Sequence, residues 1–118
     1  MNIQLTIKNV NNTEIINVEN INDIEHFCYE DSYGASNELF LLNDGIEIKR
    51  KGDSHNTHLL LSQNKESFIE IISPEGLLKI DAKVLAFERN NDIIILDYKV
   101  NEELNSIEIK NVGVVYDK

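Results

Sequence analysis

Residues 39–50 read LFLLNDGIEIKR and contain two apolar segments separated by a turn. Asn43-Asp44-Gly45 carries the turn, because Asp-Gly favours the primed turns that match the twist of two antiparallel strands. After the turn, Ile46 and Ile48 alternate with charged residues, which is the pattern of a strand with one buried face. These residues therefore predict a β-hairpin.

The same alternation recurs on both sides of this hairpin. It predicts further strands at residues 3–8, around Ile16 and Val18, and at 57–61, 68–72, 78–86, 93–100 and 104–116. Turn residues separate the strands roughly every ten positions, the spacing of a β-sandwich or β-barrel. Residues 19–28 fit a strand, a loop or a short helix, since Ile21, Ile24, Phe27 and Cys28 have helical spacing.

We expect residues 1–118 to form a single all-β domain, a closed antiparallel barrel of about eight to ten strands. Closing the sheet removes the edge strands that an open meander would leave free to pair with other chains. A two-sheet sandwich is the alternative. The interior of a barrel of about eight strands is either packed with side chains or holds one small ligand.

Composition narrows the class of protein. The chain carries 11 basic and 21 acidic residues, a net charge of −10, which opposes binding to nucleic acids and anionic membranes. Cys28 is the single cysteine, so no intrachain disulfide forms. No apolar segment approaches the roughly 18 residues of a membrane span, and residues 1–8 do not resemble a signal peptide. We expect a cytoplasmic protein.

From about Ile46 onward the chain resembles a bacterial family of calycin-like β-barrel proteins, the YwiB-like family. The resemblance lies in Arg50 and Gly52 after a strand, in Leu59-Leu60-Leu61, in the turn at residues 73–77, and in Tyr98-Lys99-Val100. The order and spacing of these motifs cover roughly residues 28–112. The resemblance implies a closed antiparallel barrel related in shape to lipocalins. It implies no activity, and lipid binding would rest on fold analogy alone.

Arg50 is the first candidate for a ligand-binding residue. It has the parity of Ile46 and Ile48, so a regular strand directs its guanidinium toward the interior. A buried charge needs a partner, and Glu30 is one candidate. Near a barrel mouth, the guanidinium could bind a carboxylate or phosphate. Alternatively, Arg50 pairs with an internal acid, or its strand bends toward solvent.

Tyr98 is the second candidate, because it shares the parity of Ile94 and Leu96. Its inward hydroxyl needs a hydrogen bond from the protein or from a ligand. Phe27 and Tyr29 have the opposite parity to Cys28. If these aromatic rings face inward, Cys28 and His26 are exposed.

No catalytic or metal constellation emerges from the sequence. His55 and His58, three residues apart on a strand, point to opposite faces, and His26 has no nearby partner. Cys28 and His26 lack a third group for nucleophilic catalysis, and no Gly-x-Ser-x-Gly motif is present. We therefore expect no metal, no cofactor and no enzymatic activity.

Two functions remain open. The first is binding of a small, partly apolar or anionic ligand inside the barrel, with Arg50, Tyr98 and Glu30 as ligand-binding residues. The second is a protein-interaction or scaffold barrel with a packed core, whose function lies on an outer surface. We expect neither a nucleic-acid nor a membrane partner, and the sequence leaves the oligomeric state open.

Overall fold

The structure, a computed structural model, describes residues 1–113, and this part of the chain contains ten β-strands and no helix. The strands are β1 (Ile3–Lys8), β2 (Thr13–Val18), β3 (His26–Glu30), β4 (Ser36–Leu41), β5 (Gly45–Lys51), β6 (Asn56–Ser62), β7 (Ser67–Ser73), β8 (Gly76–Arg89), β9 (Ile93–Val100) and β10 (Glu103–Asn111). A search of the described residues for a helix long and apolar enough to cross a membrane found none.

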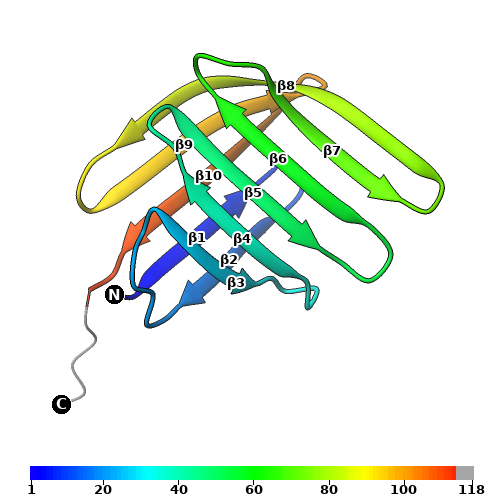
Figure 1. Ribbon diagram of the computed structural model, residues 1–118. Helices are drawn as coiled ribbons and strands as arrows, with labels where there is room; N and C mark the ends of the chain where they lie inside the picture. Colours follow the sequence, from blue (N-terminus) through cyan, green and yellow to red (C-terminus); the bar gives the residue numbers. More distant parts are fainter. Residues whose placement is uncertain (114–118) are drawn as a thin grey trace.

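All ten strands belong to one antiparallel sheet that curls into a nearly closed barrel (Figure 1). The strand order is β2-β1-β10-β9-β8-β7-β6-β5-β4-β3, so β2 and β3 lie at its two ends. Side chains rather than a strand pair bridge this seam, because the Glu14 carboxylate on β2 accepts hydrogen bonds from the backbone N–H (2.8 Å) and the hydroxyl of Ser32. The predicted all-β barrel is confirmed, with a seam where full closure was expected.

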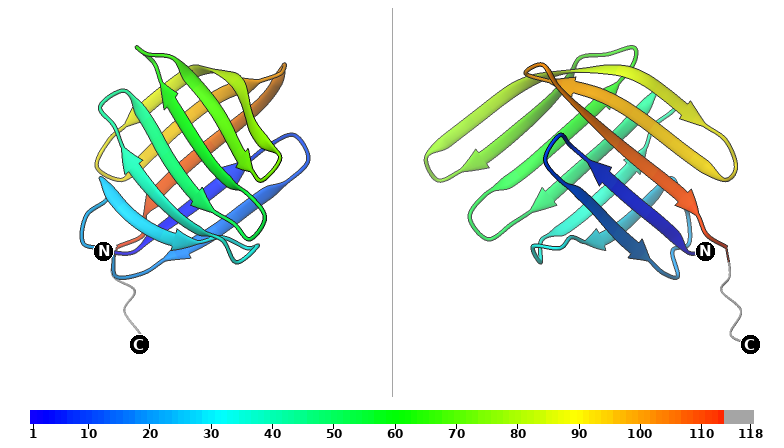
Figure 2. Two further views of the ribbon diagram at one scale, coloured as in Figure 1. Left: turned by 45° about the vertical axis from the view of Figure 1, so that its right-hand side comes forward. Right: turned by 180° about the vertical axis from the view of Figure 1, so that it is seen from behind.

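Strand β8 is the longest strand and links the two halves of the barrel. Its first half pairs with β7 and its second half with β9, and the β7–β8 hairpin projects from the barrel (Figure 2). A β-bulge between Val84 and Ala86 shifts the register. Phe87, not Ala86, therefore pairs with Leu96 and packs against the core, which corrects the simple alternation predicted for this strand.

The core fills the middle of the barrel with the inward-facing residues of the strands. Phe27 and Tyr29 are among them, and Cys28 and His26 are exposed, as the alternation of β3 requires. The side chains with under 2% exposure are Ile3, Leu5, Leu39, Ile46, Leu61, Ile94, Leu96, Ile107 and Ile109.

The hairpin predicted from residues 39–50 is confirmed as β4 and β5, but Gly45 serves a different purpose from the one expected. Its φ does not lie in the left-handed region. Instead, a Cβ at Gly45 would lie 1.7 Å from the carbonyl oxygen of Leu61 on β6. Glycine is therefore required for the close approach of two backbones, not for a primed turn.

Two segments left open or predicted differently are now defined. Residues 19–25 contain neither helix nor strand, and β3 begins at His26. The last strand ends at Asn111, and residues 112–113 do not continue it as predicted. The rest of the predicted strand, residues 114–116, lies outside the described part of the chain.

The register places five of the connecting turns at one end of the barrel, on the right in Figure 1. These turns are residues 9–12, 31–35, 52–55, 74–75 and 101–102. Arg50 lies near this end, which we call the Arg50 end.

Candidate functional site

Arg50 occupies the inner face of the sheet, as its parity predicted. It pairs with Asn37 on β4 and with Thr57 on β6. It lies two residues after the core residue Ile48, on the same face of β5. Its side chain keeps 23% of its surface exposed, and its Nε donates a hydrogen bond of 2.8 Å to Oδ2 of Asp31. Within the described residues the two Nη groups of the guanidinium make no hydrogen bond, so they remain available to a ligand.

Asp31 organises the loop between β3 and β4. Its side chain is only 7% exposed, and Oδ1 accepts hydrogen bonds from the backbone N–H groups of Tyr33 (3.0 Å) and Ala35 (3.1 Å). Oδ2 accepts from Asn37 Nδ2 (3.0 Å) as well as from Arg50. Burial alone would raise the pKa of Asp31, but the hydrogen bonds from Arg50, Asn37 and the loop outweigh it and lower the pKa below its usual value.

The pairing of Arg50 with Glu30 is therefore corrected. Glu30 ends β3 with its side chain exposed, on the face opposite to Tyr29. Strand parity could not identify Asp31, because the residue lies one position beyond the strand. A turn motif could have done so, since Asp31-Ser32-Tyr33-Gly34 places Asp at the first and Gly at the fourth position of a turn, and Gly34 has a φ of 80°.

Two tyrosines, Tyr29 and Tyr98, lie inside the barrel, and Tyr29 lies close to this ion pair. Burial raises the pKa of Tyr29, and the carboxylates of Asp31 and Glu14 raise it further, while Arg50 opposes them. Tyr98 is buried, as its parity predicted, and burial raises its pKa to about 12. Neither hydroxyl makes a hydrogen bond to another residue of the described chain. Tyr29 lines the pocket at this end of the barrel and is a potential donor to a bound molecule, whereas Tyr98 is not among the lining residues, and its role in ligand binding stays a prediction.

The side chains at the Arg50 end leave a pocket of about 220 Å³. Its walls are mainly apolar, and its charged groups are Arg50, Asp31 and Glu14. The complete lining consists of Ile7, Glu14, Tyr29, Asp31, Tyr33, Asn37, Ile48, Arg50, Thr57 and Leu59.

An exposed apolar surface adjoins this pocket on the projecting β7–β8 hairpin. The register carries the inner-face row of Arg50 and Thr57 on to Ile71 and then Leu78. Leu78, near the tip of this projecting hairpin, is 56% exposed. The inner face of the barrel is thus packed in the middle and open at the Arg50 end.

A larger hollow of about 410 Å³ lies on the outer surface of β8, β9 and β10. Val10, Leu85 and Leu104, all strongly exposed, contribute apolar surface to it. It contains no buried polar group, so it lacks the means to orient a small molecule. The smaller inner pocket is the stronger candidate for a ligand site.

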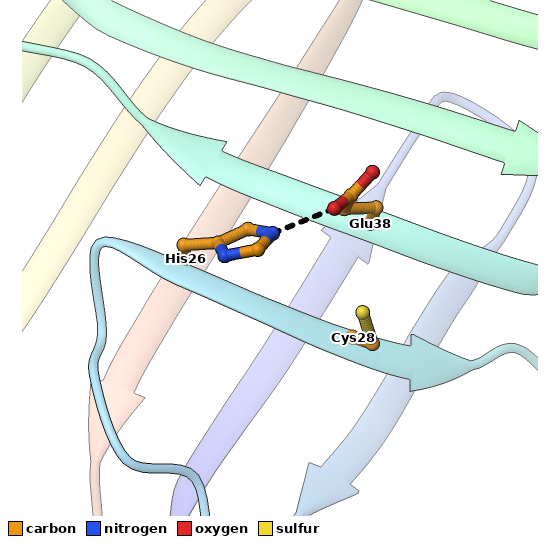
Figure 3. Close-up of side chains that lie close together, drawn as sticks. All are labelled: His26, Cys28 and Glu38. Atoms are coloured by element: carbon orange, nitrogen blue, oxygen red, sulfur yellow. Dashed lines mark hydrogen bonds and ion pairs between the residues drawn. The ribbon is translucent and has the colours of Figure 1, made fainter.

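On the outer face of β3 and β4, three potential metal ligands lie together, which corrects the expectation that His26 has no nearby partner. The Nε2 atom of His26 is 2.7 Å from Oε2 of Glu38, and Cys28 lies beside them (Figure 3). Sequence alternation placed His26 and Cys28 on one face, but only the β3–β4 register adds Glu38. By contrast, His58 lies between Glu47 and Glu70 without a thiol.

Comparisons with known proteins bear on the fold. No protein-family model matches the chain, and no curated protein matches its sequence. Among solved structures, the chain is similar to the crystal structure of the ywiB protein from Bacillus subtilis, with a TM-score of 0.57. The match has 11% sequence identity and covers 92% of this chain and 85% of that one. It supports a YwiB-like fold, and membership of a calycin-like family remains a prediction.

Proposed function

We propose that this chain is a non-catalytic binding protein that holds a small, partly apolar molecule at the Arg50 end of the barrel. The observation that carries this proposal is the state of Arg50. Arg50 lines a mainly apolar pocket, its guanidinium is fixed through Nε by Asp31, and neither Nη group makes a hydrogen bond within the described residues. A few fixed polar groups in an apolar hollow are characteristic of small-molecule sites.

The charges at the site refine the chemistry of the ligand. Asp31 already neutralises Arg50, and Glu14 adds a second carboxylate to the pocket lining. A strongly anionic ligand would therefore meet repulsion as well as the guanidinium. A neutral or zwitterionic polar group that accepts hydrogen bonds from Arg50 fits better, and its apolar part would lie along Ile71 and Leu78.

The pocket volume supports a ligand that is only partly enclosed. Pockets that bury drug-sized molecules typically measure about 300–1,000 Å³. At about 220 Å³, the pocket accommodates one end of a molecule. The remainder would cover the half-buried Ile71 and the exposed Leu78 on the inner face of the β7–β8 hairpin.

Binding can be tested with the uncharged fluorescent probe 6-propionyl-2-dimethylaminonaphthalene, which combines an apolar body with one carbonyl group that accepts hydrogen bonds. Thr57 faces the pocket beside Arg50, so Thr57→Phe should fill the pocket and weaken probe binding at least about tenfold, a loss of roughly 1.4 kcal/mol. Arg50→Gln should also weaken binding. Lys51→Gln removes the same charge from the adjacent exposed residue and serves as the control.

Equal probe binding by the parent and Thr57→Phe, with both chains folded by circular dichroism, would refute the proposed site. Native mass spectrometry of the chain purified from its own cells then tests for a natural ligand. A bound small molecule that is absent from the Thr57→Phe preparation is the expected result.

A protein-interaction barrel is the second candidate, favoured by the outer hollow. Val10, Leu85 and Leu104 expose 58%, 47% and 60% of their surface, respectively, around one depression. Exposed apolar side chains that cluster in this way often mark interfaces. Replacing Leu104 with Glu should then abolish capture of a partner without changing probe binding at the Arg50 end.

A further inference from the structure

The outer face of the β3–β4 hairpin brings three different metal-ligating groups to one point (Figure 3). Residues i and i+2 of a strand share a face, so His26 and Cys28 both point outward from β3. Glu38 pairs directly with Cys28 across the strands. One donor atom from each of the three side chains lies within 4.8 Å of the other two.

Two contacts hold the His26 ring in place before any ion arrives. The ring stacks on Phe40, its cross-strand neighbour, with 4.6 Å between ring centroids and 12° between planes. Its Nε2 also meets the Glu38 carboxylate at 2.7 Å. A ligand ordered in this way loses little further freedom when it binds a metal.

The charges around the cluster favour a cation. Within the described residues, Glu38 has no ion-pair partner except His26. Lys49, opposite Glu38 on β5, instead places its ammonium group 5.4 Å from the Phe40 ring centroid. The net charge of −10 also attracts cations.

We propose that His26, Cys28 and Glu38 form a surface site for a divalent transition-metal ion, and that Zn²⁺ fits it best. Imidazole nitrogen, thiolate sulfur and carboxylate oxygen are all ligands of zinc, at roughly 2.0–2.3 Å. Tetrahedral coordination then separates the donor atoms by roughly 3.3–3.8 Å, which small side-chain rotations achieve here. The exposed position leaves the fourth ligand to water.

The donor set also determines which ions are excluded and which proton is released. A thiolate and an imidazole select zinc, cobalt or copper over Mg²⁺ and Ca²⁺, which prefer oxygen ligands. An ionised carboxylate only accepts hydrogen bonds, so His26 carries its proton on Nε2 when it pairs with Glu38. The ion takes the Nε2 position, the imidazole proton moves to Nδ1, and the Cys28 thiol proton goes to solvent.

The test is a Co²⁺ titration of the full, metal-free chain under reducing conditions, followed by absorbance. Cobalt bound to a thiolate gives a ligand-to-metal charge-transfer band that oxygen ligands do not produce. The expected result is one Co²⁺ per chain with this band, displaced by Zn²⁺. Cys28→Ser should abolish the band, and His26→Asn and Glu38→Gln should each weaken binding at least about tenfold.

His58→Asn is the matched control, because His58 also pairs with a carboxylate, Glu47 at 2.6 Å, but has no cysteine beside it. It should leave the titration unchanged. A missing thiolate band would overturn the proposal, and so would a band that His26→Asn and Glu38→Gln leave unaltered. One Co²⁺ per two chains by native mass spectrometry would show that Cys28 bridges two molecules and would overturn it equally.

Discussion

Replacing Asp31 with Asn tests whether this carboxylate holds the Arg50 end together. The carboxylate accepts four hydrogen bonds, two at each oxygen. An asparagine side chain offers one oxygen and one amino group. In one orientation its amino group faces the Nε of Arg50 and the side-chain amide of Asn37, and in the other it faces the backbone N–H groups of Tyr33 and Ala35. In both orientations, donors face donors.

The cost follows from the bonds that are lost. A hydrogen bond to a charged group contributes about 1.5–3 kcal/mol and a neutral one about 0.5–1.5 kcal/mol. Arg50 keeps 23% of its surface in water, which partly hydrates the guanidinium once its partner is gone. We expect Asp31→Asn to lower the free energy of unfolding by about 2–4 kcal/mol.

Urea unfolding followed by far-ultraviolet circular dichroism measures this loss, since the chain has no tryptophan to report on the core. Glu30→Gln is the matched control, because it removes an adjacent carboxylate that is exposed and makes no ion pair within the described residues. It should change stability by less than about 0.5 kcal/mol. Equal effects of the two substitutions would refute the assignment of Asp31 as the partner of Arg50.

Three further outcomes follow from the same structure. Folding lowers the pKa of Asp31, so its contribution to stability is complete above the unfolded pKa of about 3.9 and is lost as pH falls through the folded pKa. The free energy of unfolding should therefore fall less steeply with decreasing pH in Asp31→Asn than in the parent chain. Burial raises the pKa of Tyr98 to about 12, so its contribution to stability is complete below pH 10 and is lost as pH rises toward 12. Tyr98→Phe should therefore reduce the loss of folding stability at alkaline pH, while Tyr33→Phe, at an exposed position, should not. Gly45→Ala places a methyl group 1.7 Å from the Leu61 carbonyl oxygen and should cost about 3 kcal/mol or more in urea unfolding, and a loss under about 0.5 kcal/mol would contradict the close approach of β5 and β6.

Alternation along the strands was sufficient to predict the barrel and the direction of most side chains. It placed Arg50 and Tyr98 on the inner face because each lies within a regular strand whose neighbours are plainly apolar or charged. For Phe27 and Cys28 it showed only that they face opposite sides, and the structure shows that Phe27 is the buried one. It failed at Ala86, because one inserted residue in β8 reverses the parity of every position that follows. A bulge leaves no dependable trace in a pattern of apolar and polar residues.

The partners of these residues could not be predicted in the same way. Arg50 and Asp31 are 19 positions apart and meet because the loop after β3 folds back over the start of β4. Glu38 meets His26 only in the register that pairs Cys28 with Glu38, and a shift of one residue would turn Glu38 to the other face. Pairing register depends on the whole sheet, so a single strand's sequence does not specify it.

Both proposed sites use the β3–β4 hairpin, and the alternation that built it also separates them. Tyr29 and Asn37 face the inner pocket, while Cys28 and Glu38 face outward. Side chains on opposite faces do not contact each other through the sheet, so each site should respond only to its own substitutions. Arg50→Gln should therefore leave the cobalt titration unchanged, and Cys28→Ser should leave probe binding unchanged. A loss of cobalt binding in a folded Arg50→Gln chain would show that the hairpin does not hold its outer ligands independently of the pocket.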